Sequence, residues 1–240
     1  MSEPPGWYGK LPSLGDFASR RLAAEFIERW DLWLGEGLAA QRATLGEAWL
    51  EAYLNSPVWR FVLMPGAVSP EVMAGVLMPS VDRVGRYFPL TIVAPIARLP
   101  GSAAEIEGLL GWLHRLEDVA LDALQDDWDI QQLDEVLAAL PAPIGETVAA
   151  ADGAALAAVL AEGGFVDIVS VRSRADLAAL VAGALGGGDT WQTRAASRGF
   201  WLADNAAAPR LLVSRGLPSH EQFIEMLGAS GRDDGATTIF

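Results

Sequence analysis

The spacing of hydrophobic residues predicts a series of amphipathic helices. In the first of them, Phe26, Trp30 and Trp33 recur at intervals of three or four residues while acidic residues take the other positions. That is the pattern of a helix with one buried face. The sequence predicts helices over residues 22–44, 47–54, 101–126, 129–140, 152–161 and 174–185, and a last one from 218 onward. We expect Ser219 to cap the last helix, because its hydroxyl can accept a hydrogen bond from the first turn.

Short apolar runs bounded by proline and glycine predict the strands, since β-branched residues concentrate in them. The predicted strands are 59–64, 72–78, 89–96, 165–171, 191–195, 200–204 and 210–214. Some strands follow one another directly and others alternate with helices, which indicates a layered α/β sandwich with a mixed sheet. We expect one domain over residues 1–228 and a frayed tail over 229–240, because that tail is small and polar.

Composition and charge exclude several classes of function. The chain has 240 residues, of which 51% are hydrophobic, so it can bury a large core. Its net charge of -14 would repel the phosphates of nucleic acids and anionic membranes. The most apolar stretch, 61–81, contains three prolines and is interpreted as strand, turn and strand rather than a membrane span. The first residues lack the basic and apolar regions of a signal peptide, so we expect a soluble protein.

The usual motifs of catalysis and cofactor binding do not fit this chain. Gly9-Lys10 lacks the hydroxyl residue of a phosphate-binding loop. The segment 35–40 (Gly-Glu-Gly-Leu-Ala-Ala) matches a loose dinucleotide-binding pattern, but it lies inside a predicted helix, so we interpret it as a helix packing contact. The two histidines, His114 and His220, have no second histidine at helical spacing, and cysteine is absent. We therefore expect no metal, no cofactor and no catalytic residues.

One acidic residue, Glu117, falls on the apolar face of its predicted helix. The hydrophobic residues that share this face are Ile106, Leu110, Leu113 and Leu124. A buried carboxylate needs a cation or hydrogen-bond donors. Two interpretations are open, a salt bridge beneath the helix and a catalytic acid, and the salt bridge is favoured. Arg83 and Arg86 are the partners that we expect first.

Two segments combine glycine, proline, aromatic and charged residues in specific motifs. They are residues 6–17 (Gly-Trp-Tyr-Gly-Lys-Leu-Pro-Ser-Leu-Gly-Asp-Phe) and residues 79–90 (Pro-Ser-Val-Asp-Arg-Val-Gly-Arg-Tyr-Phe-Pro-Leu). Both resemble the TagF (ImpM) family of type VI secretion proteins. The segments 30–33 and 53–60 fit as well, and 215–218 fits more weakly. At 189–192 (Asp-Thr-Trp-Gln) members of the family tend to carry two adjacent tryptophans, whereas this chain has Trp191 alone.

The resemblance implies both a fold and a function. TagF-like proteins are three-layer α/β/α sandwiches, so the resemblance implies that architecture, and we expect the mixed sheet of this chain to be largely antiparallel. They reside in the bacterial cytoplasm and repress the type VI secretion machine after translation. They are thought to do so by binding its forkhead-associated (Fha) scaffold protein. The resemblance therefore implies a regulator that binds a protein and is not an enzyme.

The two motif segments form the candidate site. Glycine and proline shape each of them into a tight loop that carries charged side chains. The candidate site residues are Lys10, Asp16, Asp82, Arg83 and Arg86, together with Trp191 from the weaker motif. The loop charges either bond to one another and lock the fold or contact a partner, and both can hold. The alternative is an enzyme or small-molecule-binding protein with a cleft between the two loops.

Overall fold

One antiparallel sheet organises the part of the chain that the structure describes. The computed structural model describes residues 3–97, 99–100, 103–125, 128–141, 169–170, 196–203 and 209–227. The sheet has eight strands in the order β2-β1-β5-β4-β3-β7-β8-β6. The strands are β1 Gly6–Gly9, β2 Ala18–Arg20, β3 Trp59–Leu63, β4 Val72–Met78, β5 Leu90–Ile96, β6 Val169–Ser170, β7 Arg198–Ala203 and β8 Arg210–Arg215.

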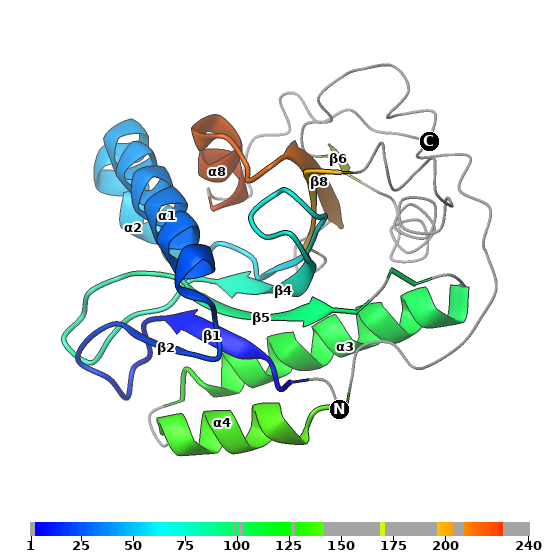
Figure 1. The fold of residues 1–240 in the computed structure, drawn as a ribbon. Helices are drawn as coiled ribbons and strands as arrows, with labels where there is room; N and C mark the ends of the chain where they lie inside the picture. The colour runs from blue at the N-terminus through cyan, green and yellow to red at the C-terminus, as the bar shows by residue number, and fades with distance from the viewer. Residues whose placement is uncertain are drawn as a thin grey trace.

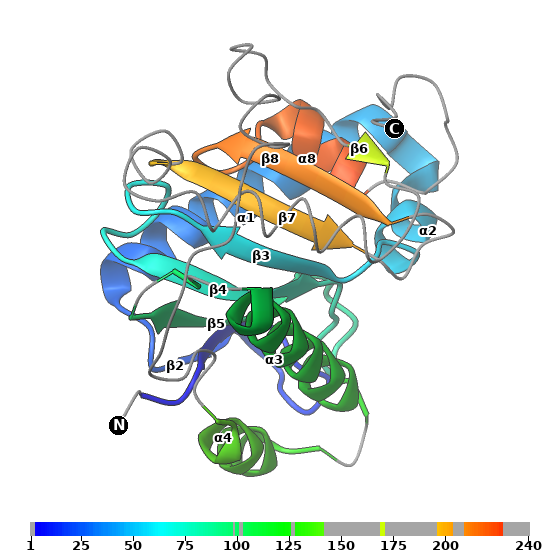
Figure 2. The ribbon, with the colours of Figure 1, turned by 90° about the vertical axis from the view of Figure 1, so that its right-hand side faces the viewer.

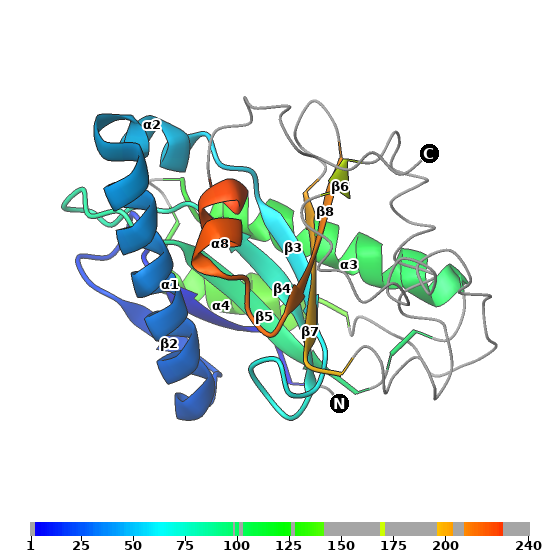
Figure 3. The ribbon, with the colours of Figure 1, turned by 90° about the horizontal axis from the view of Figure 1, so that it is seen from above.

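Helices lie on both sides of this sheet (Figures 1, 2 and 3). On one side are α1 Ala24–Leu45, α2 Trp49–Leu54 and α8 His220–Met226, with a single 3-10 turn, Gly46–Ala48, between the first two. On the other side are α3 Ala103–Asp122 and α4 Ile130–Ala139. The side chains of Trp7 in β1 and Asp134 in α4 join through a hydrogen bond from Nε1 to Oδ1 of 3.0 Å, which ties α4 to the β1 side of the sheet.

Most of the predicted elements within the described residues are confirmed, and Ser219 caps α8 as expected, its hydroxyl accepting from the N–H of Gln222. Every strand pair is antiparallel, so the antiparallel character is confirmed, but the mixed sheet is not seen among the described residues. Of the predicted strand 165–171, the structure describes β6 alone. The predicted helices 152–161 and 174–185, the predicted strand 191–195 and the tail 229–240 lie outside the described residues.

The core has two parts, one on each face of the sheet. Strand residues alternate between them: Trp59, Phe61 and Leu63 of β3 belong to the α1 side, whereas Val62 belongs to the α3 side. The α1 side is dominated by aromatic rings that pack around Trp30, which is fully buried. Its indole Nε1 donates to Thr91 Oγ1 at 2.8 Å, so burial leaves no unpaired donor.

The glycine-containing segment 35–40 lies in the middle of α1, where this helix packs against α8. A Cβ atom added at Gly37 would come within 2.6–2.7 Å of three atoms of the Phe223 ring. The same addition at Gly35 would meet nothing within 4 Å. The interpretation of this segment as a helix packing contact is therefore confirmed, and Gly37 is the residue that makes the contact.

Candidate functional site

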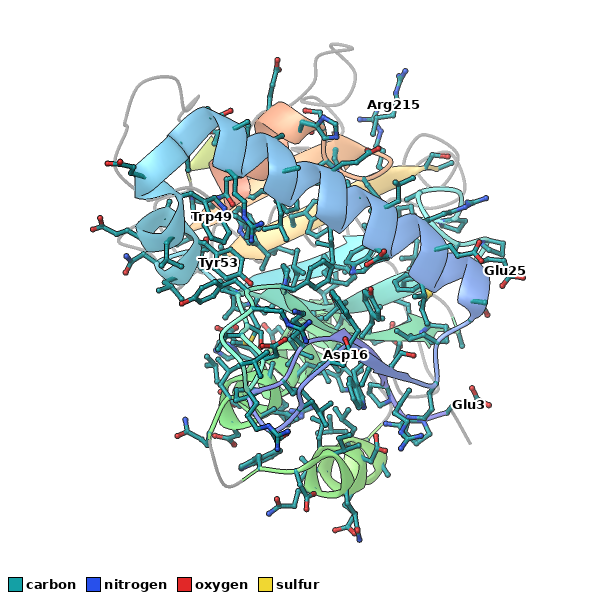
Figure 4. The ribbon with its side chains drawn as sticks, turned by 90° about the vertical axis from the view of Figure 1, so that its left-hand side faces the viewer. Glu3, Asp16, Glu25, Trp49, Tyr53 and Arg215 are labelled. Carbon is teal, nitrogen blue, oxygen red and sulfur yellow. The ribbon has the colours of Figure 1, made fainter. Side chains whose placement is uncertain are left out.

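The two motif loops lie against each other at one end of the sheet, near the N-terminal strand (Figures 1 and 3). Residues 10–17 link β1 to β2, and residues 79–89 link β4 to β5. Two hydrogen bonds to backbone carbonyls hold the loops together: the hydroxyl of Ser80 donates to Lys10 O at 2.7 Å, and the N–H of Arg83 donates to Leu14 O at 2.8 Å. We call residues 10–17 and 79–89 the two-loop site. Figure 4 views this side of the molecule and labels Asp16 on the first loop.

Two glycines allow the loops to take this shape. Gly9 has a φ of 135°, and a Cβ atom there would lie 2.1 Å from Pro89 O. The chain can leave β1 so close to β5 only because residue 9 has no side chain. Gly85, with a φ of 81°, closes the turn that begins at Asp82, and its N–H donates to Asp82 O at 2.9 Å.

Asp82 is the centre of the two-loop site. Its Oδ2 accepts from Lys10 Nζ at 2.9 Å and from Arg86 Nε at 2.7 Å. Its Oδ1 accepts from the backbone N–H groups of Val84 at 3.0 Å and Arg86 at 2.8 Å. Asp82 is 3% exposed and Lys10 is 4% exposed. The carboxylate therefore joins both loops from inside, with all of its acceptor capacity in use.

The protonation of Asp82 follows from these bonds. Burial raises the pKa of its carboxyl group, but the hydrogen bonds from Arg86, Lys10 and Val84 together lower it by more. The net pKa lies well below the usual range of an aspartic acid. Asp82 is held as an anion and is a poor proton acceptor, because an effective general base needs a pKa near the working pH.

Tyr53 of α2 fixes the start of the second loop through hydrogen bonds to the backbone of Ser80. Its hydroxyl donates to Ser80 O at 3.0 Å and accepts from the N–H of Ser80 at 2.9 Å. Burial raises the pKa of this hydroxyl well above its usual range, with opposing contributions from its bond to Ser80 and from Arg42. Figure 4 shows Tyr53 and its neighbour Trp49 at the end of α1, where α2 meets the sheet.

The outer part of the two-loop site is open to solvent. Side-chain exposure reaches 83% at Asp16 and 53% at Arg86, and these two side chains approach to only 3.9 Å. Val84 is 64% exposed and Phe17 is 45% exposed. The Phe17 ring stacks on Tyr8 and packs edge-on against Phe88 at 4.7 Å, so it is fixed in place although it faces solvent.

Five of the six predicted site residues thus lie in one place, and they do two different things. Lys10 and Asp82 are buried and bonded to each other, whereas Asp16, Arg83 and Arg86 are at the surface. Trp191 lies outside the described residues. A small-molecule site would need Lys10 and Asp82 to face a cleft, but these two charges neutralise each other inside the fold.

Glu117 has a different partner from the ones predicted. It is 7% exposed, and its Oε2 lies 3.5 Å from Nε of Arg60 on β3. His114 Nδ1 lies 3.5 Å from the same oxygen and 2.9 Å from Arg60 Nη1. The expectation of Arg83 or Arg86 was wrong, because both belong to the two-loop site and the charged residue of β3 that faces α3 is Arg60.

Sequence reasoning missed two residues of the two-loop site, Ser80 and Val84, and also Tyr53 of α2, which bonds to Ser80. Tyr53 and Ser80 form backbone-directed bonds that no motif of charged residues signals. Val84 had a usable signal: it is an apolar residue at the centre of a polar loop punctuated by proline and glycine, where no core position is expected.

Metal ligands and membrane helices were sought within the described part of the chain. No group of three or more histidine, aspartate or glutamate side chains in that part is placed to hold a metal ion. None of the described helices is both long and apolar enough to cross a membrane.

Comparison with known proteins identifies the class and then the family. A crystal structure of the protein PA0076 from Pseudomonas aeruginosa PAO1 matches with a TM-score of 0.68 and 30% sequence identity, over 97% of this chain and 98% of that one. No curated protein matches. Residues 6–140, which contain the whole two-loop site, match a type VI secretion system-associated domain. The chain belongs to that family, the TagF N-terminal domain, and its predicted resemblance is confirmed.

Proposed function

We propose that this chain is a negative regulator of type VI secretion that acts after translation by binding the Fha scaffold protein. The family membership supports a role in this secretion system. The state of the two-loop site supports binding rather than catalysis. Both of its motif segments carry charged residues, yet the buried ones bond to one another and give the loops a fixed shape.

The observation that carries this proposal is the set of four hydrogen bonds to Asp82. A catalytic carboxylate needs a free lone pair directed at a substrate or a proton. Asp82 directs both oxygens at donors of its own chain, and Lys10 uses its charge on the same group. What the two loops offer to another molecule is their outer surface, and a surface of fixed shape suits a protein partner.

We also propose a cellular compartment and a domain architecture for this chain. The chain acts in the cytoplasm, without nucleic acid and without membrane insertion, and its net charge of -14 supports the exclusion of nucleic acid. We further propose that residues 1–228 form one three-layer α/β/α domain. The helices on both sides of the sheet in the described residues support that arrangement.

The test is complex formation between two purified proteins. The chain is mixed with the Fha scaffold of its own secretion system and the mixture is separated by size-exclusion chromatography. The near-ultraviolet circular dichroism of the buried tryptophans, such as Trp30 and Trp201, verifies that the chain is folded. We expect the two proteins to elute together ahead of either one alone. Separate elution of two folded proteins at micromolar concentration would contradict the proposal.

A further inference from the structure

We propose that the partner binds at the tip of the second loop, and that the matching partner surface is acidic with an apolar recess. By tip we mean residues 83–86; the exposed ring of Phe17 lies on the first loop of the same site. This inference rests on the proposed function and adds which residues touch the partner and what chemistry they meet.

The tip is held rigidly by the groups beneath it. Asp82 accepts hydrogen bonds from the backbone of Val84 and Arg86, so the peptide groups of the turn cannot rotate freely. The turn closes on itself through the bond from Gly85 N to Asp82 O. Lys10 anchors the same carboxylate to the first loop. A surface fixed in this way loses little conformational entropy when a partner binds.

Arg83 and Val84 are the two side chains of the second loop's turn that face solvent without a bonded partner among the described residues. The Arg83 guanidinium forms no ion pair or hydrogen bond with the residues that the structure describes. Val84 beside it is 64% exposed, more than any other large hydrophobic residue of the described part. A single exposed valine is ordinary, but here it lies on a rigid turn between two arginines, in a site whose first loop carries the exposed ring of Phe17. Arginine and aromatic groups are enriched at the centres of protein interfaces.

The charge of the tip sets the chemistry of the partner. The two-loop site carries three cations, Lys10, Arg83 and Arg86, and two carboxylates, Asp82 and Asp16. Lys10 and Arg86 both pair with Asp82. The charge of Arg83 therefore remains free to pair with another molecule, at the surface of a chain that is acidic overall. The planar fork of arginine matches a carboxylate through two hydrogen bonds. We therefore infer that Arg83 pairs with an acidic side chain of the partner while Val84 enters an apolar recess.

The test compares two tip variants with two matched controls, each measured for binding to the purified Fha scaffold by isothermal titration calorimetry. Arg83→Glu is paired with Arg115→Glu, since Arg115 is an exposed arginine on α3, outside the two-loop site. Val84→Asp is paired with Leu32→Asp, since Leu32 is 61% exposed on the outer side of α1. We expect each tip variant to weaken binding at least about tenfold, and each control to change it less than about twofold.

Salt dependence tests the charge of the partner. If Arg83 meets a carboxylate, the affinity of the unaltered chain falls as sodium chloride rises from 50 to 500 mM, and Arg83→Glu removes or reverses that fall. The Debye length falls from about 14 Å to about 4 Å between these concentrations, which bracket physiological salt. Binding that is independent of salt would overturn the acidic partner.

The outcomes separate this inference from the function on which it rests. If the unaltered chain does not bind the scaffold, the proposed function fails. If it binds and both tip variants bind as tightly as their controls, the tip is not the contact and the inference fails while the function stands. Because the side chains of Arg83 and Val84 lie outside the core, all four variants should fold, which circular dichroism verifies.

Discussion

Two glycines of α1 provide a sharp test of how this chain packs. Gly35 and Gly37 lie two residues apart on the same helix, but a methyl group would meet open space at Gly35 and the ring of Phe223 at Gly37. Replacing each of them by alanine changes the same backbone propensity. The difference between the two variants therefore measures the contact between α1 and α8 alone.

The size of the effect follows from these contacts. Alanine stabilises an exposed helix interior by about 1 kcal/mol relative to glycine, so Gly35→Ala should raise the free energy of unfolding by that amount. At Gly37 the same gain is opposed by contacts of 2.6–2.7 Å with three ring atoms of Phe223. Such overpacking typically costs about 1–3 kcal/mol. We expect Gly37→Ala to be less stable than Gly35→Ala by about 2 kcal/mol.

Thermal unfolding followed by tryptophan fluorescence provides the assay. In a chain of this size about 2 kcal/mol corresponds to a difference in Tm of about 4–8 °C. Gly35→Ala should melt above the unaltered chain and Gly37→Ala below it. Equal melting temperatures for the two variants would refute the packing of α1 on α8 described above.

Two further predictions concern the buried charges. Because the folded-state pKa of Asp82 is depressed, its ionisation stabilises the fold above the unfolded value of about 3.9, and that contribution is lost as the pH falls below it. Between pH 5 and pH 3, the free energy of unfolding measured with urea should therefore fall less for Asp82→Asn than for the unaltered chain. The control variant Asp16→Asn, at an exposed position, should show the same fall as the unaltered chain. Arg60→Met should cost about 3–5 kcal/mol because Glu117 stays buried without this cation. The double variant with Glu117→Leu should recover much of that loss, and a double variant as unstable as Arg60→Met would contradict the pairing.

The spacing of hydrophobic residues predicted the central strands and helices well, but it did not predict how the strands are arranged in the sheet. The strand prediction 72–78 coincides with β4, because a continuous apolar run bounded by polar turns has few other solutions. The three residues of β2, Ala18–Arg20, were missed, since their side chains are mostly exposed and show no hydrophobic run. The placement of β1 beside β5 depends on a close backbone approach at Gly9, which no spacing of side chains reveals.

The candidate site shows the same division. The glycines, prolines and charged residues of the sequence identified both loops. The pairing of Asp82 with Arg86 agrees with one of the two interpretations, that the loop charges bond to one another. The partnership of Lys10 with Asp82 spans 72 positions of sequence, so it follows only from the fold. The partner of Glu117 was misassigned for the same reason, because which arginine faces α3 depends on the order of strands in the sheet.

The most direct test of the proposed function is the amount of tube protein that the secretion machine releases. The gene for this chain is deleted in one strain and overexpressed in another, and the tube protein is quantified in cells and in culture medium. If the chain is a repressor that acts after translation, we expect more secreted tube protein in the deletion strain and less in the overexpression strain. The total amount of tube protein, in cells and medium together, should stay unchanged. Equal secretion in all three strains would contradict it.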